Sequence, residues 1–154
     1  MKKVENKCIS ILNSAVQNDC EGGQIKGRHY PLYAAFLSPF VKEGFLSYYK
    51  PVLIDYSTPS YALEFGLAYL DDKPTFRKIV STKDVTWTIS WEELRKRNAV
   101  QATNWTPKRS QVAKKLSESV GKEVLLLKTQ KGWMFEREAL RNHSGGLVMY
   151  RLFL

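Results

Sequence analysis

One stretch near the C-terminal end constrains the fold of this chain most strongly. Four consecutive apolar residues, 124–127, are followed by the polar residues 128–131 and by Gly132. A short apolar run bounded by turn residues predicts a buried strand, and the glycine predicts a tight loop. Residues 133–138 then predict the opening of a helix. We therefore expect a strand that carries lysine, threonine and glutamine side chains, with exposed backbone amides, to one edge of a domain, an arrangement that suits a phosphate backbone.

Charge is distributed unevenly along the chain. Residues 1–72 contain 7 Lys/Arg and 8 Asp/Glu, a net charge of −1, whereas residues 73–154 contain 17 Lys/Arg and 7 Asp/Glu, a net charge of +10. A basic lobe beside a nearly neutral one indicates a polyanionic partner. We favour nucleic acid over the alternatives, which are an acidic membrane surface and a charge that serves only solubility.

Length and composition exclude several classes of protein. At 154 residues with 44% hydrophobic content, the chain can fold as one domain or as two small lobes. No run of eighteen apolar residues predicts a membrane span, and neither a secretory signal nor a transit peptide is evident. The two cysteines, Cys8 and Cys20, are too few for a disulfide framework or a four-ligand zinc site, and a Cys/His metal site would need both of them together with His29 and His143, the only histidines. We expect no cofactor and no metal.

Hydrophobic periodicity and turn residues predict an α+β protein whose first lobe spans residues 1–73. Its expected order is helix, strand, helix, strand, strand, and the last two strands form an antiparallel hairpin. Residues 61–67 are equally compatible with a helix by composition. The expected elements are a helix at 4–17, a weak edge strand at 24–29, a helix at 31–42 that contains Pro39, and strands at 45–55 and 61–70.

The second lobe, residues 74–154, is predicted to be rich in strands with short helices. Ser90 with Glu93 three residues later forms a capping box, which predicts the start of a helix that ends near Arg97. Residues 97–121 have the character of an insertion. The other expected elements are strands at 76–80 and 85–89, an irregular stretch at 98–107, a helix at 110–120, the strand and loop described above, a helix to about 142, a turn at 144–146 and a strand at 147–153.

Taken in order, several short motifs resemble those of the bacterial-type small ribosomal subunit protein eight. No single motif is specific, but their order and spacing are, and they cover nearly the whole chain outside about 97–121. They end in the pattern Lys-Gly-x-Met-x-x-Arg-Glu-Ala followed by Gly-Gly. The matching pieces are Ile11-Leu12-Asn13-Ser14, Val41-Lys42-Glu43-Gly44-Phe45-Leu46, residues 63–69 with Lys73-Pro74, Ile79-Val80-Ser81, Glu92-Glu93-Leu94, Thr129, Lys131-Gly132, Met134, Arg137-Glu138-Ala139 and Gly145-Gly146.

The resemblance implies a two-lobed α/β protein that binds the central domain of small-subunit rRNA during assembly, next to other small-subunit proteins. Members of this family contact an irregular RNA helix with a Ser-Thr-Ser-Lys-Gly loop. Here Thr129, Lys131 and Gly132 match that loop, while Lys128 and Gln130 replace its two serines. Both replacements can still donate hydrogen bonds to phosphate or to a 2′-OH. A protein that binds mRNA as a free translational regulator would use the same surface.

The candidate RNA-binding residues come from the loop, from the following helix, from the glycine turn and from basic clusters. Gly132 either lets the backbone approach RNA closely or is an ordinary turn glycine, and Trp133 is expected to pack rather than to stack on a base. Glu136 and Glu138 are interpreted as acids that complement a helix dipole. The candidates are Lys128, Thr129, Gln130, Lys131, Gly132, Arg137, Gly145, Gly146, Lys108, Arg109, Lys114, Lys115 and Arg28.

Enzymatic function is not expected, because the sequence contains no glycine-rich phosphate loop after a strand and no Ser/His/Asp set. The alternative we retain is a nucleoside-processing enzyme of the deoxyribosyltransferase type, which residues 62–69 with Lys73-Pro74 faintly resemble. That enzyme needs a helix at this position and a parallel sheet. The resemblance implies a ribosomal location. The insertion and the altered loop favour a mitochondrial ribosome, with a bacterial cytoplasm as the alternative, and we expect no membrane association and no homo-oligomer.

Overall fold

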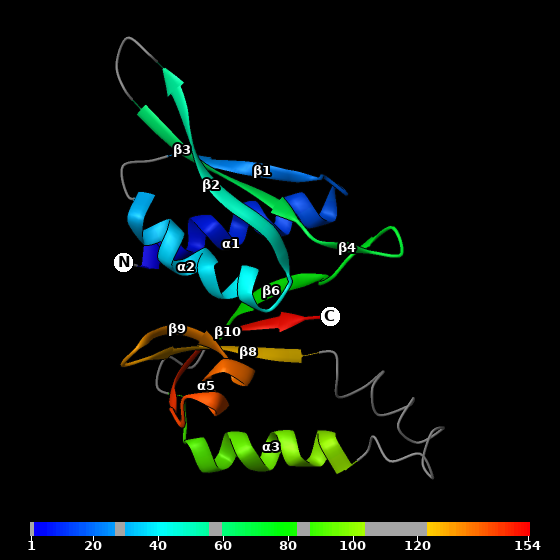
Figure 1. The fold of residues 1–154 in the computed structure, drawn as a ribbon, viewed down its shortest axis with the longest axis vertical. Coiled ribbons are helices and arrows are strands. Elements are labelled where there is room, and N and C mark those ends of the chain that lie inside the picture. Colours follow the sequence, from blue (N-terminus) through cyan, green and yellow to red (C-terminus); the bar gives the residue numbers. More distant parts are fainter. Residues whose placement is uncertain (1, 27–29, 56–59, 83–86, 104–122) are drawn as a thin grey trace. The chain divides into compact units, whose positions relative to one another are not determined.

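The chain divides into two compact units, Met1–Ile79 and Val80–Leu154. The computed structural model describes residues 2–26, 30–55, 60–82, 87–103 and 123–154 (Figure 1). Both units combine helices with antiparallel strands, so the predicted α+β class is confirmed. Within the described residues, the structure has no helix with the length and apolar character that a membrane crossing requires.

The first unit has the predicted order of helix, strand, helix, strand, strand. Its three-stranded sheet is antiparallel with the order β1-β3-β2, so β1 is an edge strand as expected. Because residues 60–67 form the central strand of this sheet, the helical alternative for this segment is wrong, and the helix that the deoxyribosyltransferase-type enzyme needs is not there. The elements are α1 (Lys2–Gln17), β1 (Gly22–Lys26), α2 (Tyr30–Lys42), β2 (Leu46–Asp55), β3 (Ser60–Leu67), β4 (Tyr69–Leu70) and β5 (Lys73–Pro74).

Both helices of the first unit pack on one face of its sheet (Figure 1). The apolar residues of α1 form one buried stripe, because they recur every three to four residues and so share one side of the helix. Aromatic residues of α2 and alternate residues of the strands complete this core. The buried members include Cys8, Leu12, Val16, Tyr33, Phe36, Phe40, Ile25, Leu63 and Phe65.

The second unit is built around a sheet with the strand order β6-β10-β8-β9, in which β7 also pairs with β10. Helix α5 packs on β8 and β9 and also contacts α3, so it lies between the sheet and that longer helix (Figure 1). The elements are β6 (Lys78–Ser81), β7 (Thr88–Ile89), α3 (Trp91–Thr103), β8 (Glu123–Thr129), β9 (Gly132–Phe135), α5 (Glu136–Arg141) and β10 (Gly146–Phe153).

In the described part of the second unit, β7, α3, β8, β9, α5 and β10 each contribute at least one apolar side chain to a buried cluster. Strand β8 contributes Leu125 and Leu127, and Leu126 on its other face is also fully buried. A strand with both faces buried needs an unbroken apolar run, which is why residues 124–127 carry so strong a signal in the sequence. The other members of the cluster are Ile89, Leu94, Met134, Ala139 and Val148.

The prediction that the loop after residue 131 leads directly into a helix is wrong. Residues 132–135 form strand β9, which returns along β8 as the second strand of a hairpin, and the helix begins only at Glu136. The reason is tertiary pairing. Met134 and Phe135 lie opposite Leu127 and Leu126 and are buried there. This burial favours a strand in a segment that is too short to show a hydrophobic periodicity of its own.

The predicted end of the helix near Arg97, and the irregular structure expected from residue 98, are also wrong. Helix α3 runs for 13 residues, from Trp91 to Thr103. Ser90 caps it as predicted, since its Oγ accepts a hydrogen bond from the Glu93 backbone N–H at 3.2 Å. Asn98 fits inside the helix because its side-chain amide donates to the Leu94 carbonyl, 2.8 Å away. The helix predicted at 110–120 lies outside the described residues.

Candidate nucleic-acid interface

The loop identified in the sequence is the tip of the β8–β9 hairpin. Thr129 pairs with Gly132 across the turn, so Gln130 and Lys131 are its two central residues. The Thr129 hydroxyl holds this turn, because it accepts a hydrogen bond from the Lys131 backbone N–H at 3.1 Å and donates one to the Gly132 carbonyl at 2.9 Å. The proton of this hydroxyl is therefore used inside the turn, and only its remaining lone pair can serve an outside group.

Gly132 is required by the backbone conformation of the turn. Its φ is +113°, which side chains of L-residues rarely allow. A Cβ added to this glycine would meet no atom within 4 Å, so steric crowding inside the protein does not explain the residue. The space above the Gly132 backbone is open, and a ligand can approach it closely.

The polar side chains of the hairpin tip point into solvent. Lys128, Gln130 and Lys131 are all exposed. The Lys128 ammonium lies 5.5 Å from the centre of the Trp133 ring, which sits directly across the hairpin. Trp133 is half-buried, and its ring centre is 6.2 Å from that of Tyr150, which is the packed arrangement that we expected for this tryptophan.

Gly145 and Gly146, at the start of β10, are required by close contact between neighbouring strands. A Cβ on Gly145 would lie 2.5 Å from the Ile89 carbonyl oxygen, and a Cβ on Gly146 would lie 2.5 Å from the Lys128 carbonyl oxygen. Both distances are shorter than any real Cβ contact. Only glycine therefore allows the start of β10 to pass between the end of β7 and the end of β8.

The turn that precedes these glycines ends helix α5. The His143 backbone N–H donates to the Leu140 carbonyl at 3.2 Å, and the Ser144 N–H donates to the Ala139 carbonyl at 2.9 Å. This pair of bonds is the Schellman motif, which needs a left-handed residue at the position of His143. The φ of His143 is +50°, as the motif demands. The chain then turns directly into Ser144 and the glycine pair.

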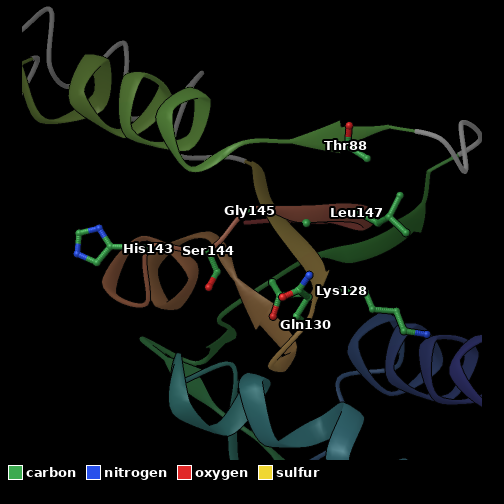
Figure 2. A pocket seen from close by; sticks show the side chains of 9 residues that line it. Thr88, Lys128, Gln130, His143, Ser144, Gly145 and Leu147 are labelled. Carbon is green, nitrogen blue, oxygen red and sulfur yellow. The ribbon is translucent and has the colours of Figure 1, made fainter.

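These two segments, which the sequence suggested separately, form the walls of one open pocket of about 530 Å³. Figure 2 shows its residues gathered from the end of β8, from the turn after α5, from β7 and from the start of β10. Five predicted residues line it, and Lys131, Gly132 and Arg137 are not among its lining residues. The lining residues are Thr88, Lys128, Thr129, Gln130, His143, Ser144, Gly145, Gly146 and Leu147.

Thr88 and Ser144 are pocket residues that sequence reasoning missed. Thr88 reaches the pocket because its strand pairs with β10, opposite Leu147. Ser144 reaches it because the Schellman turn directs the chain there. The local sequence around Ser144 carries a usable signal, a polar residue between a helix end and a glycine pair. Thr88 carries none, because its position depends on a strand pairing that spans about sixty residues.

Three acids of the second unit, Glu123, Glu136 and Glu138, are held in ion pairs. Glu136 pairs with Arg97, Glu123 with Arg151, and Glu138 with Arg141. Within the described part of the chain, none of these pairs involves a cation of the hairpin tip or the exposed Arg137. Lys128, Lys131 and Arg137 are exposed and therefore available to a polyanion.

Glu136 has a role that the sequence did not indicate. It lies in the first turn of α5, as predicted, but only 5% of its surface is exposed. Its carboxylate accepts hydrogen bonds from the Leu125 backbone N–H at 3.0 Å and from the Arg97 side chain. Burial raises the pKa of Glu136 above its ordinary value, although both donors act in the opposite direction. The Glu136 carboxylate thus ties α5 to α3 and to β8, the strand that carries the hairpin tip.

Several predicted site residues have no structural description. Arg28, Lys108, Arg109, Lys114 and Lys115 lie outside the described residues. In comparisons with known proteins, neither the models of protein families nor the curated protein sequences yield a match to this chain.

Proposed function

We propose that this protein is a structural component of the small ribosomal subunit that binds the central domain of small-subunit rRNA and supports its assembly in translation. The observation that carries the proposal is the pocket in which the basic hairpin tip meets the glycine turn. Two segments that the sequence analysis assigned to RNA contact line the same open cavity, although about fifteen residues separate them in the chain. The resemblance to small ribosomal subunit protein eight points to the same partner.

The chemistry of the pocket suits the backbone and ribose of a structured RNA. Lys128 lines the pocket and carries an ammonium that can neutralise a phosphate, and the polar residues Gln130, Thr88 and Ser144 line it as well. The Gln130 amide can both donate and accept, as recognition of a 2′-OH requires. The Ser144 hydroxyl donates to the Asn142 carbonyl at 3.1 Å, so it is left as an acceptor. An open cavity at a strand edge can admit the sugar and one base edge of an irregular helix, where the minor groove is accessible.

The geometry divides the five loop residues into two roles. Thr129 and Gly132 shape the turn, the first through its two internal hydrogen bonds and the second through its positive φ. We assign the RNA contacts to the exposed side chains of Lys128, Gln130 and Lys131, together with the open backbone at Gly132. The basic cluster at 108–115 and Arg28 are proposed as peripheral contacts. Neighbouring small-subunit proteins are the other expected partners, and a mitochondrial ribosome is the proposed location.

A salt titration with a central-domain rRNA fragment tests this proposal. Because each phosphate contact releases counterions, the slope of log K against log salt concentration reports the number of contacts. The double variant Lys128→Ala/Lys131→Ala should bind more weakly at physiological salt, with a slope smaller by about 1.4–1.8, which corresponds to two lost contacts at about 0.7–0.9 each. Lys42→Ala removes an exposed lysine from the end of α2 in the other unit, and it should leave the slope unchanged.

The proposal fails if the parent chain does not bind the rRNA fragment tightly at physiological salt. The assignment of the hairpin fails separately if the double variant and the Lys42 control give the same slope. Co-sedimentation with small ribosomal subunits distinguishes a resident ribosomal protein from a free regulator that binds mRNA.

A further inference from the structure

A second aromatic and basic group lies beside the pocket, at the start of α3. The indole N–H of Trp91 donates to the Leu140 carbonyl at 3.2 Å, which fixes the ring against the end of α5. The His143 imidazole packs on this ring with 4.8 Å between ring centres and an angle of 39° between planes. The Arg95 guanidinium lies 5.7 Å from the centre of the same ring. Trp91 is half-buried, while His143 and Arg95 are exposed.

The backbone conformation of His143 favours glycine over histidine. Its φ of +50° places it at the left-handed position of the Schellman motif, where glycine is the usual residue and asparagine the common substitute. A histidine at this position carries a steric cost between its Cβ and the backbone that glycine does not. The turn itself does not require an imidazole, and the side chain is exposed, so core packing does not require one either.

An imidazole at this position offers a stacking surface that is already oriented. One face of the ring rests on Trp91, whose own position is fixed by its hydrogen bond. His143 lines the edge of the pocket, and its ring extends away from Lys128 and Gln130 (Figure 2). An RNA bound in the pocket would therefore continue past this ring. Histidine and arginine planes are among the surfaces on which unpaired bases stack in RNA-binding proteins.

We propose that Trp91, His143 and Arg95 form a second RNA contact that takes an unpaired nucleotide of the RNA bound in the pocket. The base stacks on the outer face of His143, Trp91 supports that ring from behind, and the Arg95 guanidinium binds the adjacent phosphate. This inference rests on the proposed RNA-binding function of the pocket. It adds three residues that the sequence analysis did not assign to RNA.

The variant His143→Gly separates an RNA-binding role from a structural one. Glycine fits the left-handed turn, so the melting temperature should stay the same or rise, whereas affinity for the central-domain rRNA fragment should fall by about tenfold, as expected for the loss of one stacked base. An affinity equal to that of the parent overturns the inference. A loss of affinity together with a lower melting temperature also overturns it, because it would mark His143 as a packing residue.

Arg95→Gln provides an independent test with a matched control. It should weaken binding several-fold and reduce the salt slope by about 0.7–0.9, as for one lost phosphate contact. Lys96→Gln removes the same charge from the next residue of α3, which is also exposed, and should leave the slope near that of the parent. Equal effects of the two variants contradict a specific role of Arg95.

The two proposals can fail separately. If the parent binds the rRNA fragment and the Lys128/Lys131 double variant flattens its salt slope, the pocket is an RNA site. An unchanged His143→Gly variant then rejects only the second contact. If the parent does not bind the fragment, both proposals are rejected together.

Discussion

We predict that Glu136→Ala destabilises the folded chain by about 2–3 kcal/mol. The Glu136 carboxylate accepts a hydrogen bond from the backbone N–H of Leu125, which is fully buried. Leaving such a buried donor unpaired costs about 1–3 kcal/mol. The lost ion pair adds at most about 1 kcal/mol, because the Arg97 side chain is 31% exposed and keeps access to water. The variant Glu138→Ala is the control, since Glu138 lies in the same helix but is more exposed and pairs with Arg141 at 3.7 Å.

Two measurements report this loss. In urea, the midpoint of unfolding should fall while the m-value stays constant, because the surface exposed on unfolding does not change. In hydrogen exchange, the Leu125 amide should exchange roughly 30- to 150-fold faster, since each 1.4 kcal/mol corresponds to a factor of ten. Glu138→Ala should change stability by less than about 1 kcal/mol and leave the Leu125 amide protected.

The raised pKa of Glu136 also predicts the direction in which the cost of Glu136→Ala changes with pH. Burial raises the pKa of Glu136 above its ordinary 4.5, so the folded chain holds this proton more tightly than the unfolded chain does. The extra stabilisation linked to this raised pKa is therefore fully present below pH 4.5 and is lost as pH rises through the folded pKa, so Glu136→Ala should cost more at acidic than at neutral pH. A Glu136→Ala variant within about 0.5 kcal/mol of Glu138→Ala at both pH values would refute the reasoning.

Three further predictions follow from single contacts. The hydrogen bond from Arg151 lowers the pKa of Glu123 below its ordinary 4.5. The stability that this bond adds is therefore present above pH 4.5 and is lost as pH falls through the folded pKa. In a curve of stability against pH, Glu123→Gln should therefore reduce the fall in stability at acidic pH. Burial raises the pKa of Cys8 to about 12, whereas Cys20 is exposed, so a thiol reagent at pH 8 should modify one cysteine in the native chain and both in denaturant. Gly146→Ala places a Cβ 2.5 Å from a carbonyl oxygen of the paired strand and should lower the melting temperature by several degrees in a thermal scan.

The first unit could be predicted from its sequence because its signals are local. The apolar stripe of α1 has a helical period over 16 residues, and α2 begins beside a proline, as a helix start favours. Strand β9 could not be predicted in the same way. Its four residues have no period of their own, and they become a strand only because Met134 and Phe135 find buried partners on β8. Helix α3 runs past its predicted end at Arg97, a residue that is held by Glu136, 39 residues away.

The candidate site was predictable in part, and the limit is again set by topology. The composition of the hairpin tip identified the basic loop, and the glycine pair identified the turn before the last strand. Neither signal states that the two segments meet. The two segments meet because Leu147 pairs with Lys128 in the sheet, and because Gly146 has no side chain to collide with the Lys128 carbonyl. The position of Thr88 in the pocket depends on the same long-range pairing.

A loop residue can match a family pattern because the turn needs it or because the partner needs it, and the structure distinguishes these two cases. Of the three residues shared with the Ser-Thr-Ser-Lys-Gly loop, Thr129 and Gly132 are explained by the turn itself, through hydrogen bonds and a positive φ. Any protein with this hairpin has a use for them, whatever it binds. Lys131 is the shared residue whose side chain the turn does not use, and it is exposed. We therefore expect Lys131 to make the RNA contact that this chain has in common with the family it resembles, while Lys128 and Gln130, both exposed where the pattern has serine, make contacts particular to this chain.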